Sequence, residues 1–207
     1  MKKLIFILGM LFVLGSFTAC TSREIVPKMY INQAELTKEE KNIVNLMGTN
    51  LNNKIFDFTV DETIKAIQIN TYKLQGDKWQ VISGGGGHVL DDSEGRIALT
   101  FENIAKGMRT TLQSENTNSS VAHTIPTTDE FADMGRATSY LSNDTEIEYE
   151  KEIPLIIQIS TTKNEISSYS VEYFNHPEEY QKLGYEYIYA VTVMFSQKTV
   201  NELDEKY

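Results

Sequence analysis

The feature that most constrains the fold is an alternation of side chains near the C-terminal end. Large apolar residues occupy every second position from Tyr185 to Phe195. This period of two places all of them on one face of a β-strand, because successive side chains point to opposite faces. A strand with so apolar a face has to pack against other apolar surface. We therefore expect a long core strand over residues 185–196.

The same period recurs in short segments along most of the chain. Gln75-Gly76-Asp77 predicts a hairpin between two of these segments, and the polar residues 114–120 predict a loop. Many short strands separated by turns indicate a mainly β fold, either a β-sandwich or an open barrel of antiparallel strands. Strands are predicted over residues 55–60, 63–74, 78–83, 96–101, 108–113, 121–125, 153–161 and 166–174.

One helix is predicted N-terminal to these strands, over residues 36–51. Thr37 and Glu40 have the spacing of a capping box, in which each side chain accepts a hydrogen bond from the other residue's backbone N–H. The apolar residues recur at helical spacing, so we expect one N-terminal helix packed on the β core. Residues 127–130 could cap a short helix that carries Phe131 and Met134, and a helical turn is predicted over 178–183. The apolar face of the helix predicted over 36–51 comprises Ile43, Val44, Leu46, Met47 and Leu51.

The start of the chain has the pattern of a secretion signal that ends at the only cysteine. Lys2-Lys3 precedes the apolar run Leu4–Gly15, which is shorter than the roughly 20 residues that a membrane-spanning helix needs. Small residues, Thr18-Ala19, stand directly before Cys20. This arrangement resembles the signal peptide of bacterial lipoproteins, although Phe17 stands where leucine is usual.

The resemblance implies cleavage before Cys20 and acylation of its thiol, so that the protein is held in the cell membrane and faces the extracytoplasmic side. Two acyl chains anchor a protein stably. The expected organisation is a signal peptide over 1–19, a tether over 20–34 and a single β-rich domain over 35–207. The alternative is an ordinary secretion signal beside a free thiol.

The charge of the mature chain argues against nucleic acid as a partner. Residues 1–19 hold two of the 19 basic residues and no acidic one, so 17 basic residues remain against 29 acidic ones, a formal charge of −12. Binding to nucleic acid needs a basic patch. The same charge disfavours close contact with an anionic lipid surface.

One candidate ligand site is the glycine run that follows the strand at 78–83. Gly85 and Gly86 could let backbone amides approach a ligand, with His88 and the nearby Trp79 beside them. The run lacks the lysine and the following helix of a phosphate-binding loop. A flexible hairpin or a β-bulge is the alternative interpretation.

The second candidate is a group of tyrosines, Tyr169, Tyr173 and Tyr180. Tyrosine combines a flat apolar ring with a polar tip and is frequent on surfaces that bind sugars or proteins. Core packing is the alternative explanation for tyrosines in a β protein.

No pattern of catalytic or metal-ligating residues stands out. The three histidines are far apart in the sequence, the acidic turn 91–95 lacks the spacing of a calcium loop, and no G-x-S-x-G motif occurs. We therefore expect no catalytic residue, metal or cofactor. The glutamates at 146, 148, 150 and 152 leave open a hydrolase whose carboxylates meet only in the folded chain.

Three functions follow from these observations. The first is a non-catalytic binding or accessory module for another envelope protein. The second is a lipoprotein that binds a glycan or small ligand, and the third is a carboxylate-based hydrolase. A β-sandwich serves all three, so the fold does not choose among them.

Overall fold

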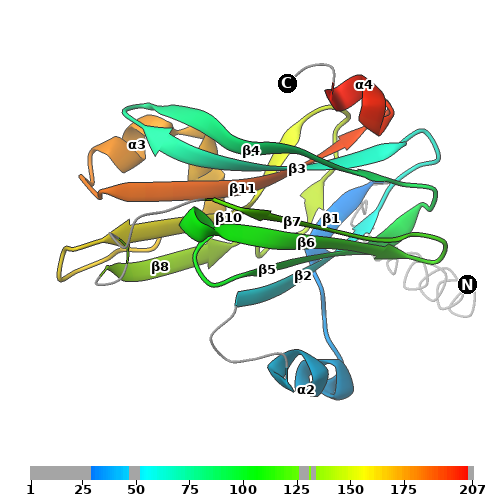
Figure 1. Ribbon diagram of the computed structural model, residues 1–207, viewed down its shortest axis with the longest axis horizontal. Helices are drawn as coiled ribbons and strands as arrows, with labels where there is room; N and C mark the ends of the chain where they lie inside the picture. Colours follow the sequence, from blue (N-terminus) through cyan, green and yellow to red (C-terminus); the bar gives the residue numbers. More distant parts are fainter. Residues whose placement is uncertain (1–28, 47–51, 126–130, 132–133, 205–207) are drawn as a thin grey trace, which may run out of the picture.

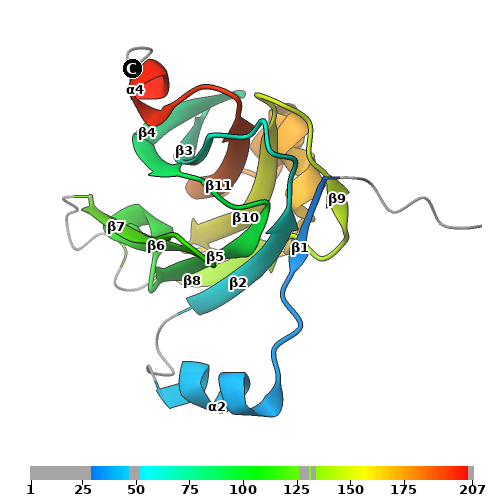
Figure 2. The same cartoon turned by 90° about the vertical axis from the view of Figure 1, so that its right-hand side faces the viewer.

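The computed structural model describes residues 29–46, 52–125, 131 and 134–204, and Figure 1 shows their arrangement. Two antiparallel sheets face each other as a sandwich that does not close into a barrel (Figure 2). The predicted β-sandwich is confirmed. Within the described residues, no helix is long and apolar enough to cross a membrane.

One sheet has six strands in the order β7-β6-β5-β2-β1-β9. The predicted segments 55–60, 96–101, 108–113 and 121–125 all lie in it. The loop predicted over 114–120 is shorter than expected, because β7 already begins at Asn118. The strands are β1 (Tyr30–Gln33), β2 (Asn52–Thr59), β5 (Glu94–Phe101), β6 (Gly107–Ser114), β7 (Asn118–Thr124) and β9 (Thr145–Glu146).

The other sheet has five strands in the order β4-β3-β11-β10-β8. Its centre is β11, the strand predicted from the alternation of large apolar residues. The predicted hairpin at Gly76 joins β3 to β4, with Gly76 at a φ of 63°. The strands are β3 (Ala66–Gln75), β4 (Lys78–Val89), β8 (Gly135–Tyr140), β10 (Glu152–Thr161) and β11 (Tyr187–Ser196).

The core lies between the two sheets, and its buried apolar residues come mainly from β1, β2, β3, β5, β6, β10 and β11. Phe58 of β2 meets Phe195 of β11 across the sandwich, with ring centroids 5.5 Å apart. Leu99 of β5 and Leu155 of β10 are fully buried. Burial of apolar side chains of this size is the main term that stabilises such a fold.

Short helical segments cover the outer face of the five-stranded sheet. They are η3 (Val171–Asn175) and α3 (Pro177–Gln181) at one end and α4 (Val200–Asp204) over β4 (Figure 1), whereas η1 (Ile104–Lys106) connects β5 to β6. The prediction of a strand over 166–174 was wrong. Val171 of η3 and Tyr180 of α3 are instead the buried residues of this covering segment, and the Ser170 side chain caps η3.

The N-terminal helix is α2 (Lys38–Leu46), and it lies on the outer face of the six-stranded sheet (Figure 2). The predicted capping box is confirmed, since Thr37 N–H donates to Glu40 at 2.7 Å and Glu40 N–H donates to the Thr37 hydroxyl at 3.2 Å. The helix is packed more loosely than predicted, because none of residues 38–46 is buried.

The predicted tether over 20–34 reaches too far into the domain. Residues 30–33 form β1, which pairs with β2 and β9, and Ile31 is completely buried. The signal peptide, Cys20 and residues 127–130, which were predicted to cap a short helix, lie outside the described residues.

Candidate functional site

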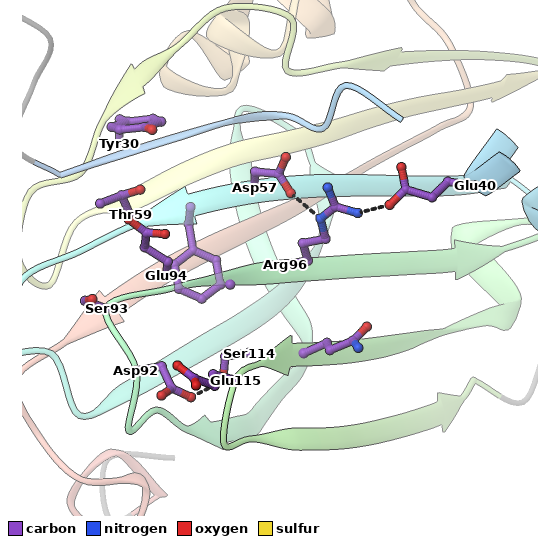
Figure 3. Close-up of a pocket in the computed structure, with 13 residues that line it drawn as sticks. Tyr30, Glu40, Asp57, Thr59, Asp92, Ser93, Glu94, Arg96, Ser114 and Glu115 are labelled. Atoms are coloured by element: carbon purple, nitrogen blue, oxygen red, sulfur yellow. Dashed lines mark hydrogen bonds and ion pairs between the residues drawn. The ribbon is translucent and has the colours of Figure 1, made fainter. Parts of the chain in front are cut away.

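An open hollow occupies the outer face of the six-stranded sheet beside α2 (Figure 3). Its volume is about 770 Å³. Cross-strand pairs form its floor: Asp57 of β2 is opposite Arg96 of β5, and Thr59 is opposite Glu94. Because paired residues in an antiparallel ladder share a face, these side chains point outward together. Tyr30 of β1 and the ends of β5 and β6 complete the rim.

A guanidinium between two carboxylates connects α2 to this floor. Arg96 donates from Nη1 to Glu40 Oε1 at 2.6 Å, and its Nε lies 2.8 Å from Asp57 Oδ1 (Figure 3). Glu40 thus caps its own helix with one oxygen and holds Arg96 with the other. The hydrogen bond from the Thr37 backbone and then the one from Arg96 lower the pKa of Glu40 to about 2. This carboxyl group is ionised throughout the physiological range.

The hollow is strongly acidic. Five carboxylates line it against the single guanidinium of Arg96. Asp92 accepts hydrogen bonds from the Ser114 hydroxyl at 2.5 Å and from the Asn116 backbone at 2.9 Å, which lower its pKa, the Ser114 bond contributing most. These hydrogen bonds to Asp92 stabilise the turn between β6 and β7. The carboxylates belong to Glu40, Asp57, Asp92, Glu94 and Glu115.

A second, more apolar cavity of about 260 Å³ continues from the hollow beneath α2. We call it the helix groove. Leu36, Ile43 and Val44 line it from the helix side. Ile55 and Ala98, which are paired across β2 and β5, line it from the sheet. The hollow and the groove are thus two parts of one outer face.

The structure brings together four of the residues predicted to bind a ligand, Trp79, Tyr169, Tyr173 and Tyr180. Trp79 and Tyr180 have ring centroids 6.0 Å apart, and the three tyrosines contact one another edge to face at 5.5–6.3 Å. Tyr180 is 1% exposed, and burial, with some contribution from the other two tyrosines, raises its pKa. Only Tyr173 among the four is exposed, at 39%. Ligand binding there stays a prediction.

The glycine run lies at the far end of β4 from Trp79, so the predicted association of these residues does not form. Gly85 and Gly86 continue the strand, whose pairing with β3 is irregular near Asn70, as the bulge interpretation expected. A Cβ atom at Gly87 would lie 2.9 Å from Cγ1 of Val200 in α4. We infer that a glycine at this position allows α4 to approach the sheet.

His88, the last of the predicted ligand-binding residues, is buried in the sandwich. It is 2% exposed, and its ring nitrogens lie 2.6 Å from the Ser119 hydroxyl and 3.1 Å from that of Thr110. These contacts join β4 to β6 and β7 across the two sheets. Burial lowers the pKa of His88, which favours the neutral ring.

The sequence alone does not predict the hollow, although its patterns identify Glu40 as a helix cap and place Glu94 in an acidic turn. Asp57 and Arg96 carried a usable signal, because each is a charged side chain inside an apolar alternation. Their pairing depends on the register of β2 and β5, which the sequence does not reveal.

Among the described residues, no three His, Cys, Asp or Glu side chains are placed to hold a metal ion together. Comparison with known proteins finds no family model that matches this chain. No curated protein and no solved structure matches it either.

Proposed function

We propose that this protein is a membrane-anchored extracytoplasmic lipoprotein that binds another envelope protein through the acidic hollow. The anchor rests on the resemblance of residues 1–20 to a lipoprotein signal. The observation that carries the binding function is the shape and charge of the outer face of the six-stranded sheet. Its hollow is open, it lies beside a loosely packed helix, and carboxylates dominate its lining.

The state of the carboxylates favours binding over catalysis. A general acid needs a pKa near the working pH. Hydrogen bonds hold the pKa of Glu40 at about 2 and also lower that of Asp92. Both side chains already accept hydrogen bonds from protein donors, so their role is to shape and charge the surface.

Glycan binding is the alternative, and the exposure of Tyr173 beside Tyr169 is the observation that favours it. Trp79 stacks on Phe174 at 5.1 Å and contacts Tyr180, so its fluorescence reports on this cluster. A shift of that fluorescence on titration with cell-wall or host glycans would favour the alternative.

Site-specific crosslinking in intact cells tests the binding function. A photoreactive amino acid replaces Gln113, which lines the hollow, and in a matched control it replaces Gln75 at the β3–β4 hairpin. Both glutamines are exposed, so neither change disturbs the core. We expect one dominant envelope protein crosslinked from position 113 and not from position 75. Equal crosslinking from both positions, or none from 113, would contradict the proposed site.

Replacement of the cysteine tests the anchor. We expect Cys20→Ser to abolish incorporation of radiolabelled palmitate, because the variant lacks the thiol that is acylated. The domain should then be released or should keep its signal peptide, which fractionation and mass measurement distinguish. Equal labelling of wild type and variant would refute the anchor.

A further inference from the structure

We propose that the helix groove receives the apolar side of a basic amphipathic segment of the partner, while the acidic hollow binds the basic side of the same segment. This inference rests on the proposed function, and it specifies the chemistry that the partner presents. Uncovered apolar side chains, a cavity beneath them and an adjacent field of negative charge carry the argument.

The helix beside the groove leaves its apolar side chains uncovered. Ile43 is 61% exposed and Leu46 is 86% exposed, and none of residues 38–46 is buried. Isolated helices shorter than about 12–15 residues are marginal in water, and packing of an apolar face normally stabilises them. The nine residues of α2 lack such packing. An apolar partner in the groove would supply it.

The sheet side of the groove offers a complementary apolar floor. Ile55 and Ala98 are adjacent on β2 and β5, and Thr111 of β6 extends the same row. All three are half-buried. A partner side chain placed between this row and Val44 of α2 would contact apolar atoms on both sides, which removes apolar surface from water.

The groove opens directly into the acidic hollow. Glu40, Arg96 and Gln113 line both cavities. The cross-strand row that includes Arg96 and Gln113 lies between the apolar row at Ala98 and the acidic row at Glu94. One extended or helical segment of the partner can therefore contact the apolar groove and the acidic hollow at the same time.

The charge of the surface specifies the partner. Arg96 is already paired with Glu40 and Asp57, so the remaining carboxylates of the hollow attract cations. Lysine or arginine on the partner segment supplies them, whereas nucleic acid and anionic lipid would be repelled. A second copy of this chain fits poorly, because its mature part carries a formal charge of −12, from 17 basic and 29 acidic residues.

The test uses the full-length protein in intact cells, with photoreactive residues placed singly at Val44 in the groove and at Gln113 in the hollow. Mass spectrometry then sequences the crosslinked peptide of the partner. We expect both positions to capture the same segment, with apolar residues on one side and an excess of lysine and arginine on the other.

Two substitutions separate the apolar from the charged contribution. Ile43→Asp places a charge in the groove, and its matched control, Asn42→Asp, places the same charge at the neighbouring position, which does not line the groove. Loss of one buried isoleucine contact should weaken binding by about tenfold to a hundredfold. We expect crosslinking from Gln113 to fall by that factor in Ile43→Asp and to stay unchanged in Asn42→Asp. Glu94→Lys should also reduce it.

The outcomes distinguish the role of the groove from the proposed function. Crosslinks from Gln113 with none from Val44, or crosslinks that Ile43→Asp leaves unchanged, would show that the partner does not bind in the groove. Either result would leave the proposed function standing. An acidic or uncharged partner segment, or a second copy of this chain, would also overturn the inference. No crosslink from either position would remove the proposed function as well.

Discussion

Replacement of Phe58 by alanine should lower the free energy of unfolding by about 3–5 kcal/mol, the cost of removing a large aromatic ring from a packed core. Phe58 is 2% exposed and contacts Phe195 of the opposite sheet. Its ring also lies under Gly95, where a Cβ atom would be only 2.7 Å from it. Removal of the ring therefore leaves a cavity between the two sheets that reaches the floor of the acidic hollow.

Denaturant unfolding measures this loss. Thr59→Ala is the matched control, because Thr59 is the next residue of β2 and points to the opposite face, where it lines the hollow. We expect the control to change stability by less than about 0.5 kcal/mol. A loss below about 1 kcal/mol for Phe58→Ala would show that the sheets do not pack through this contact.

Gly107→Ala should destabilise the protein by about 2–5 kcal/mol, which combines an unfavourable backbone conformation with overpacking. Gly107 ends η1 and begins β6 with a φ of 115°. A Cβ atom there would lie 2.2 Å from the carbonyl oxygen of His123 in β7. Since that oxygen belongs to the backbone of the neighbouring strand, the strand has to move.

Gly76 provides a control with a positive φ and no close contact. Its φ is 63°, but a Cβ atom at Gly76 would meet no atom within 4 Å. Gly76→Ala should therefore cost only about 1–2 kcal/mol. Equal midpoints for the two variants in thermal or denaturant unfolding would show that contact with β7 contributes nothing.

The strands could be predicted from the sequence because their signal is local. The alternation from Tyr185 to Phe195 became the central strand β11, and the hairpin at Gly76 has the expected place. The strand predicted over 166–174 was wrong because part of this segment forms the short helix η3, which buries its apolar side chain by packing on the sheet and not by strand pairing. Apolar alternation over a short segment does not distinguish these two ways of burying a side chain.

The candidate site was less predictable because it depends on pairing between distant strands. Asp57 and Arg96 are 39 positions apart by their numbers and meet only through the register of β2 and β5. Tyr169, Tyr173 and Tyr180 lie together because they are close in the sequence, but the burial of Tyr180 was not predicted. The predicted association of Trp79 with the glycine run and His88 does not form, because β4 is 12 residues long and Trp79 lies near its other end.

The position of β1 determines how the domain would respond to a mechanical load. In a protein held by Cys20, a pull on the membrane side enters the described domain near Tyr30, where β1 begins. This strand lies between β2 and β9 and is antiparallel to both. A force along its axis loads the hydrogen bonds on its two sides together, in shear. Tension from the membrane would thus reach the six-stranded sheet first, and with it the floor of the hollow.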